Sequence, residues 1–246
     1  MKEMSLVEHL EELRTTVIRV AVIVLVAFVL AYGLGEYISE ILLTPLRAGL
    51  GSQSGGQIVY LGLLDKVISQ LQLAFWSSIL LSSPLWFYEL WRFIKPGLYD
   101  HEAKMVRPFL IVGFFLFILG ACFAYYVVFP LTFELLLDFG VKNVQATISL
   151  REYIVLSSKA LLFFGLAFQL PNVCLILGFM GLVTKYSLKN IRRYVYVGFA
   201  GASAFITPPD IVSMVGLWLP LCLLYELGIM AVAMIVHPYL ERKHGD

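Results

Sequence analysis

The stretch from Pro108 to Phe129 reads PFLIVGFFLFILGACFAYYVVF and carries no charged side chain. An α-helix needs about 20 such apolar residues to cross the hydrocarbon core of a bilayer. The whole chain of 246 residues is 60% hydrophobic and only 14% charged, with a mean hydropathy of +0.85. Soluble domains carry about 25% charged residues, so a very apolar soluble helical protein is disfavoured. We predict an all-α integral membrane protein.

Six segments are predicted to cross the membrane within a single domain that covers residues 1–246. They are residues 17–34, 67–90, 108–129, 153–180, 194–206 and 211–236. Pro84 predicts a kink in the second segment. Residues 1–15 are predicted to form an amphipathic segment outside the membrane. Ser5 and Glu8 have the spacing of a capping box at a helix start, and the apolar residues that follow, beginning with Leu6, share one face. The predicted loops at 35–66 and 130–152 are long, and residues 133–139 have the pattern of a short surface helix.

The lysines and arginines predict which side of the membrane the termini share. Thirteen of the 18 fall on the side of the two termini. The remaining five fall on the opposite side: Arg47, Lys66, Lys142, Arg151 and Lys159. Cytoplasmic loops carry the excess of positive charge, so we predict that both termini are cytoplasmic, which requires an even number of spans.

The fifth predicted span is short and rich in small residues, including Gly198 and Gly201. Its 13 residues would rise about 20 Å, against a hydrocarbon core of about 30 Å. Either the bilayer thins there, or neighbouring protein covers the ends, or the boundaries lie a few residues away. The small residues allow a partner helix to approach closely, from this chain or another.

The sequence lacks the motifs of membrane enzymes and pumps. It has no G-x-x-x-x-G-K-[ST] phosphate loop, which argues against a built-in ATPase. The histidines lie outside the predicted spans or at their ends: His9, His101, His237 and His244. The cysteines lie far apart in apolar runs: Cys122, Cys174 and Cys222. We therefore predict no enzyme activity, cofactor, metal site or nucleic-acid partner.

Several polar residues are candidates for function. Glu12 lies four residues after Glu8 in the N-terminal segment, where the two carboxylates form either a solvated acidic face or a site for a cation. Glu102 is either a binding group or a loop carboxylate paired with Lys104 or Arg107. Gln169 precedes Pro171, which frees a backbone carbonyl that Gln169 or water can satisfy.

Three charged residues at the predicted spans have simpler interpretations. Lys159 can snorkel to the outer interface. Glu226 can be interfacial at the inner end of the sixth span. Glu89 can pair with Arg92 three residues later, and it is expected to add negative potential at the inner surface.

The chain resembles the TatC family from end to end, in five motifs that occur in order along a six-span chain. They are His9–Arg14 (HLEELR), Trp91–Tyr99 (WRFIKPGLY) with Glu102, Phe129–Leu131 (FPL), Phe168–Pro171 (FQLP) and Thr207–Asp210 (TPPD). The resemblance implies a curved, glove-like bundle of six helices in the bacterial cytoplasmic membrane, with both termini in the cytoplasm.

The resemblance also implies a function and its residues. The family binds the twin-arginine signal peptides of folded proteins and exports them with single-span TatA and TatB-type partners in a multimeric complex, using the proton-motive force. Its signal-peptide residues fall on Glu12 and Glu102, with Arg14 and Phe93 at other motif positions near that surface. Arginine suits such carboxylates because its planar guanidinium donates bidentately.

Partner contact or structural roles are expected near the fifth and sixth spans, at Gly198, Gly201, Thr207, Pro208 and Asp210. The chain departs from the family at Gln169, where a carboxylate is usual, so a hydrogen-bonding role is expected there instead of protonation. A small-solute secondary transporter is the alternative function. That function predicts internal repeats and broken helices at the bilayer midplane, and the sequence shows no repeat.

Overall fold

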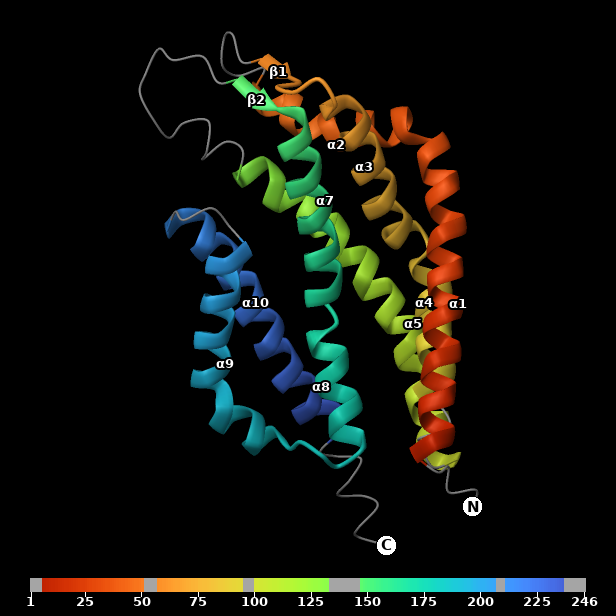
Figure 1. Cartoon of the computed structure of the whole chain (residues 1–246). Helices are drawn as coiled ribbons and strands as arrows, with labels where there is room; N and C mark the ends of the chain where they lie inside the picture. Colours follow the sequence, from red (N-terminus) through yellow and green to blue (C-terminus); the bar gives the residue numbers. More distant parts are fainter. Residues whose placement is uncertain (1–5, 51–56, 95–99, 133–146, 207–210, 237–246) are drawn as a thin grey trace, which may run out of the picture. The chain divides into compact units, whose positions relative to one another are not determined.

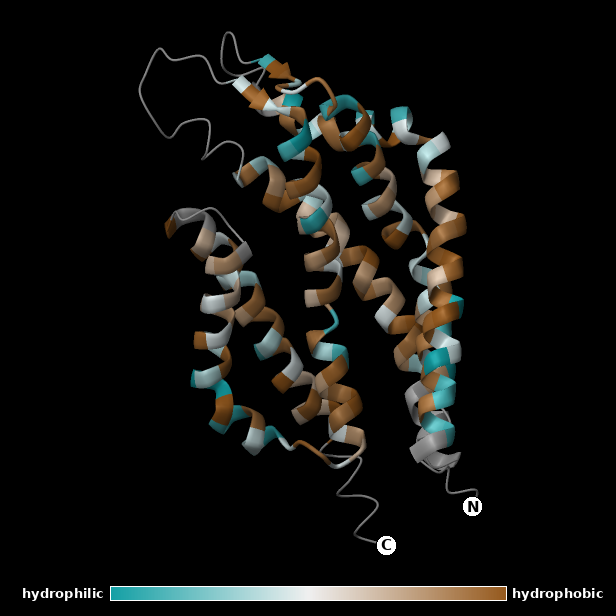
Figure 2. Cartoon of the chain, viewed as in Figure 1, coloured by the Kyte–Doolittle hydropathy of each residue, from teal (hydrophilic) through white to brown (hydrophobic). Residues whose placement is uncertain are grey.

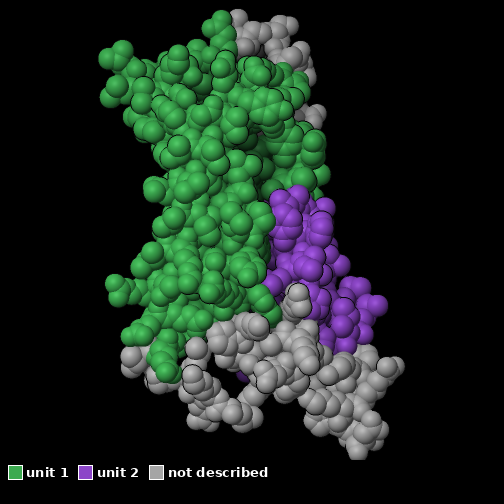
Figure 3. All heavy atoms as spheres, turned by 90° about the vertical axis from the view of Figure 1, so that its right-hand side faces the viewer, with its two compact units in different colours: residues 1–103, 121–163 green, residues 104–120, 164–246 purple. Residues whose placement is uncertain are grey.

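The computed structural model in Figure 1 describes residues 6–50, 57–94, 100–132, 147–206 and 211–236. The chain forms two compact units (Figure 3). The first unit comprises residues 1–103 and 121–163, and the second comprises residues 104–120 and 164–246. Each unit is described by itself below.

The described chain is almost entirely helical. The helices are α1 (Leu6–Gly33), α2 (Gly35–Leu50), α3 (Asp65–Leu81), α4 (Ser83–Ile94), α5 (Asp100–Phe123), α7 (Leu150–Ala167), α8 (Leu170–Phe179), α9 (Lys185–Ile206) and α10 (Ile211–Ala231). Two π-helical stretches, η2 (Ala124–Val128) and η3 (Val232–Val236), continue α5 and α10. The strands β1 (Gln57–Val59) and β2 (Thr147–Ser149) pair in parallel, with Gln57 opposite Thr147. The all-α prediction is confirmed.

Four helical stretches of the described chain are long and apolar enough to cross a membrane: Glu8–Gly33, Pro108–Thr132, Leu150–Phe179 and Met214–Val236. The other two predicted spans are also helical, but one is divided between two helices and the other belongs to a helix that begins with basic residues. Residues 67–90 fall on two shorter helices, α3 and α4. Residues 194–206 form the second half of α9, whose 22 residues begin at Lys185 and include four basic residues in the first half.

In the first unit, α1 is one continuous helix that packs along α3 and α4. The predicted N-terminal segment and first span therefore share a helix from Leu6 onward. Figure 2 shows the change in character along it, from hydrophilic at the N-terminal end to hydrophobic over the rest. A rigid helix therefore carries the polar N-terminal residues on the same axis as the span.

The kink predicted at Pro84 is a break between α3 and α4 at Ser82. Proline cannot donate a backbone hydrogen bond, and it disturbs the turn before it. The indole Nε1 of Trp86 donates to the carbonyl oxygen of Ile79 at 2.9 Å, which satisfies one acceptor at the break. The broken helix is thus stabilised locally by its own aromatic side chain.

The predicted loop at 35–66 contains a helix, α2, although Pro45 lies inside it. Pro45 leaves the carbonyl of Ile41, four residues earlier, without its helical donor. The hydroxyl of Tyr125 donates to that oxygen at 2.6 Å, and the hydroxyl of Tyr153 donates to the next carbonyl, of Leu42, at 2.5 Å. The sequence analysis missed this helix within the predicted loop because these donors come from residues far along the chain.

In the second unit, α10 packs against both α8 and α9. The apolar core of this unit is formed by Cys174, Leu175, Leu188, Tyr225, Ile229, Val232 and Val236. Polar side chains fix the α9–α10 pair: Tyr225 donates to the carbonyl of Leu188, and Trp218 donates to that of Tyr196, both at 2.9 Å. A Cβ added at Gly120 of α5 would collide with the carbonyl oxygen of Phe164, so the glycine allows α5 to approach the backbone of Phe164 closely.

Candidate functional site

One face of α1 carries His9, Glu12, Thr16 and Arg19, because residues three or four apart share a side of a helix. This face meets α4 near its C-terminal end. The rings of His9 and Phe93 stack with centroids 4.7 Å apart and planes inclined by 23°. The structure thus brings together two of the motifs that the sequence singled out, HLEELR and WRFIKPGLY.

Glu12 has an unusual environment on this face. Its side chain is partly buried, and its Oε2 atom is hidden from solvent without any hydrogen-bond partner among the described residues. Nearly all buried polar atoms in proteins have a partner, because an unsatisfied acceptor costs desolvation energy. Among the described residues, this oxygen therefore lacks the donor that a buried carboxylate oxygen normally has.

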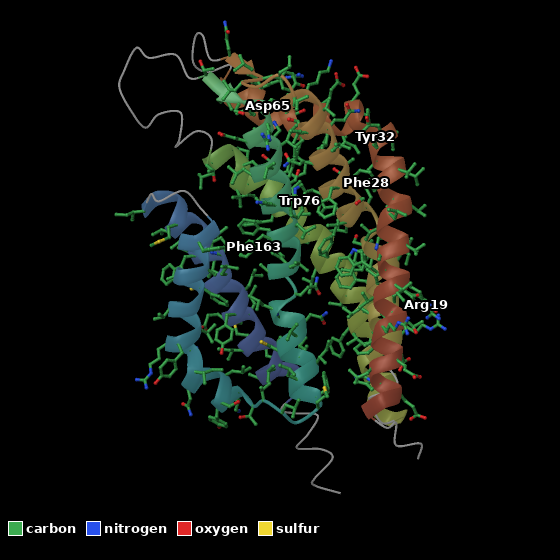
Figure 4. All side chains as sticks on the ribbon, viewed as in Figure 1. Arg19, Phe28, Tyr32, Asp65, Trp76 and Phe163 are labelled. Carbon is green, nitrogen blue, oxygen red and sulfur yellow. The ribbon has the colours of Figure 1, made fainter. Side chains whose placement is uncertain are left out.

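Glu89 of α4 is buried, with 9% of its surface exposed, and it lies between two arginines. Its carboxylate is 4.0 Å from Arg92 and 3.5 Å from Arg19 of α1, which is labelled in Figure 4. The predicted pair with Arg92 is confirmed. The expectation that Glu89 adds negative potential is wrong, because two cations flank this one anion.

Arg19 was not singled out from the sequence, although a signal was available. Arg19 and Glu89 are lone opposite charges near the same predicted end of the first and second spans. Intramembrane charges usually pair, so their complementarity could have predicted the contact. The ion pair ties α1 to α4 two turns beyond Glu12.

The structure does not bring all the predicted site residues to this face. Arg14 is exposed and follows Glu12 by two residues, which places it on the other side of α1. Glu102 falls in the first turn of α5, and its side chain lies outside the described residues. Glu12 and Phe93 are thus the predicted residues whose side chains have a described place at this surface.

Gln169, in the second unit, lies just before α8, where Pro171 interrupts the helical chain. Its Nε2 atom donates to the carbonyl of Gly113 on α5 at 2.7 Å. The neighbouring Asn172 donates to the carbonyl of Phe109 on α5 at 3.0 Å and lies 3.3 Å from Oε1 of Gln169. The two amides fasten α8 to α5, so Gln169 bonds another helix and not the carbonyl freed by Pro171.

Gly198 and Gly201 lie exposed on α9. A Cβ added at either glycine would meet nothing within 4 Å. Packing among the described residues therefore gives no reason for these two small residues. Thr207, Pro208 and Asp210, the other predicted partner-contact residues, lie outside the described part of the chain.

Glu226 of α10, in the second unit, is the centre of another ionic cluster. Its Oε1 atom accepts a hydrogen bond from the hydroxyl of Tyr196, and its Oε2 atom accepts one from Arg192 Nη2 at 2.8 Å. Arg192 Nε also lies 2.7 Å from Oε1, although its N–H points elsewhere, so this contact is electrostatic. Glu226 thus links α10 to α9 with both of its oxygens occupied.

No group of three or more histidines, cysteines or acidic residues is placed to hold a metal ion in the part of the chain that the structure describes. The three cysteines are free thiols, of which Cys174 is buried. The described residues thus form neither a metal centre nor a disulfide.

Comparison with known proteins places these features in a family. A sequence model described as Sec-independent protein translocase protein (TatC) matches residues 8–220. The TatC protein of Desulforapulum autotrophicum is 39% identical over 91% of this chain and 82% of its own length. That of Campylobacter jejuni is 33% identical over 97% of both chains, and that of Escherichia coli K12 is 32% identical over 91% of this chain and 86% of its own.

Solved structures give the same result. A crystal structure titled as the twin-arginine translocase receptor TatC superposes with a TM-score of 0.83, at 32% identity, covering 92% of this chain and 99% of the other. A second crystal structure of that receptor, in the detergent DDM, gives a TM-score of 0.82 at 34% identity. The predicted fold class is confirmed, and the transporter alternative finds no support. The chain belongs to the TatC family and is a membrane subunit of the Sec-independent, twin-arginine protein translocase.

Proposed function

We propose that this subunit binds the twin-arginine signal peptides of folded proteins on the face of α1 that carries Glu12. The observation that carries the proposal is the buried Oε2 atom of Glu12, which has no hydrogen-bond partner among the residues that the structure describes. A guanidinium presents donors in a planar fork that matches a carboxylate. An arginine of the peptide would therefore supply the donor that Glu12 lacks.

Neighbouring residues support this role for Glu12. The stack of His9 on Phe93 fixes the end of α1 against α4, and the Arg19–Glu89 pair holds the same two helices further along. A site with a fixed position loses little conformational entropy on binding. In this proposal Phe93 positions the surface, Glu102 receives the second arginine, and Arg14 contacts the peptide from the exposed side of α1.

The test is the binding of a twin-arginine signal peptide and of its lysine–lysine counterpart to the purified protein in detergent. We expect the wild type to prefer arginine, and Glu12→Gln and Glu102→Gln each to weaken arginine binding about tenfold or more, since hydrogen bonds to charged groups contribute about 1.5–3 kcal/mol. Glu11→Gln is the matched control, because Glu11 is exposed on α1 beside Glu12. Equal binding of both peptides, or equal losses in Glu11→Gln and Glu12→Gln, would contradict the proposal.

The partner surface that we propose lies on α9, together with the Thr207–Asp210 turn. The exposed Gly198 and Gly201 have open space around them and suit a closely packed helix. We assign this face to single-span TatA or TatB-type proteins in a multimeric complex. Gly198→Leu is expected to reduce co-purification of these partners without lowering the unfolding temperature, and unchanged co-purification would contradict the assignment.

The proposed setting is the bacterial cytoplasmic membrane, with six spans, both termini in the cytoplasm and export driven by the proton-motive force. The bias of lysine and arginine toward one side supports this orientation. A cysteine added after Asp246 should stay unlabelled by a membrane-impermeant thiol reagent in intact cells. Labelling before lysis would reverse the proposed topology.

A further inference from the structure

One face of α3 is polar along four positions, within the first unit. Asp65, Ser69, Gln72 and Trp76 recur at helical spacing and share this face. Two of them contact α7: Asp65 is 3.2 Å from Arg151, and the ring of Trp76 lies 5.9 Å from the ammonium of Lys159. Asp65 and Trp76 are labelled in Figure 4. Both ends of this face therefore contact α7.

Two buried polar atoms on this face have no partner in the described part of the chain. Ser69 is 2% exposed, and its Oγ atom is buried without a hydrogen bond. The Oε1 atom of Gln72 is buried and unpaired in the same way. Buried polar atoms that lack a protein partner are usually satisfied by water. We call the two helix faces that carry Asp65, Ser69, Gln72, Trp76, Arg151 and Lys159 the α3–α7 seam. Its unpaired buried atoms favour water at a depth where lipid is normally apolar.

Lys159 stands at the inner end of this seam, eight residues or about 12 Å beyond Arg151 along α7. It lies within the apolar stretch Leu150–Phe179 and is exposed on the described chain. None of the described carboxylates lies within 4.0 Å of its ammonium, and its one described contact is the Trp76 ring. A lysine at such a depth requires an anion or a path to the interface.

The ammonium of Lys159 lies over the Trp76 ring. Arg151, about two turns earlier on α7, has a side chain that is 43% exposed although it pairs with Asp65. Two cations and one carboxylate then leave the seam, which also contains Trp76, with a net positive charge. Basic sites between membrane helices suit anionic lipid headgroups.

We propose that the α3–α7 seam binds an anionic phospholipid, whose phosphate pairs with Lys159 beside Trp76. Lipid is the occupant that an exposed residue on a membrane helix meets first, and the positive charge selects an anionic headgroup. This site is separate from the face of Glu12 and does not depend on the signal-peptide proposal.

The test is native mass spectrometry of the purified protein, titrated with phosphatidylglycerol and with phosphatidylcholine of the same acyl chains. Wild type should retain phosphatidylglycerol preferentially. Lys159→Gln should weaken that binding about fivefold and abolish the preference, since one cation near a membrane surface contributes about that factor. Lys159→Arg keeps the charge and should keep the preference.

Lys66→Gln is the matched control, because Lys66 is an exposed cation beside Asp65 that lies off the polar face of α3. It should bind phosphatidylglycerol as wild type does. Equal losses in both glutamine variants would show only general surface charge and would overturn the proposal. Lipid binding by Lys159→Gln that equals wild type would also overturn the proposal. The contradiction would be most direct if that variant lost a protein partner from the complex, because Lys159 would then pair with a carboxylate of that partner.

Discussion

Two carboxylates, one in each unit, show how the same side chain serves different purposes. Glu226 accepts hydrogen bonds from Tyr196 and Arg192 and has both oxygens occupied. Glu12 is partly buried, and one of its oxygens has no partner among the described residues. A satisfied carboxylate stabilises the fold, whereas an unsatisfied one is costly unless a ligand completes it. Changes at the two positions should therefore affect different properties.

The largest effect on stability is expected from Glu226→Gln. This change removes the negative charge that pairs with Arg192 and leaves that cation without its counter-ion on α10. The cluster is partly exposed, so we expect the free energy of unfolding to fall by about 2 kcal/mol, below the full cost of a broken buried pair. Thermal unfolding in detergent measures it. Glu40→Gln, at an exposed position on α2, is the control, and an equal shift in both would contradict the comparison.

Tyr196→Phe removes one donor from the same carboxylate and keeps the ring in place. The ring packs edge-on against Trp218 with centroids 6.3 Å apart, a contact that phenylalanine preserves. We expect a loss of about 1 kcal/mol in the free energy of unfolding, the usual value for one hydrogen bond. Tyr194→Phe is the control on an exposed ring of α9. A loss as large as that of Glu226→Gln would mean that the tyrosine, and not the ion pair, holds α9 to α10.

Arg19→Gln tests the intermediate case, because Glu89 is buried but its nearer cation is 3.5 Å away and 41% exposed. Exposed ion pairs contribute little, so we expect the free energy of unfolding to fall by only about 0.5 kcal/mol. Peptide binding should weaken less than in Glu12→Gln, because Arg19 positions α1 and does not contact the peptide. Peptide binding lost as fully as in Glu12→Gln would place Arg19 in the binding site itself.

The fold could be predicted where the signal was local. Apolar length indicated the membrane helices, and Pro84 indicated the place where the second predicted span breaks. For Pro171 the sequence indicated only a freed carbonyl, and the structure shows an interruption of the helix there. Helix α2 was missed because Tyr125, which satisfies the carbonyl freed by Pro45, comes 84 residues after Ile41. No local pattern reports a donor at that distance.

The sequence predicted which residues belong to the candidate site better than it predicted which residues contact each other there. Motif residues Glu12 and Phe93 followed from the resemblance, and the structure places both where α1 meets α4. The stack of His9 on Phe93 and the pairing of Arg19 with Glu89 join residues about 70 to 84 positions apart. These contacts depend on how α1 and α4 pack, which single-helix periodicity does not determine. The unpaired oxygen of Glu12 is likewise a property of packing.

The most direct test of the account is a double-mutant cycle between Glu12 and the arginines of the signal peptide. Binding of peptides with Arg-Arg, Lys-Arg and Arg-Lys is measured on wild type and on Glu12→Gln. If Glu12 holds one arginine, replacing that arginine should cost about tenfold on wild type and almost nothing on the variant, while Glu12→Gln unfolds within about 0.5 kcal/mol of wild type. Peptide and protein changes that simply add, for both arginines, would show that the buried oxygen of Glu12 contacts neither.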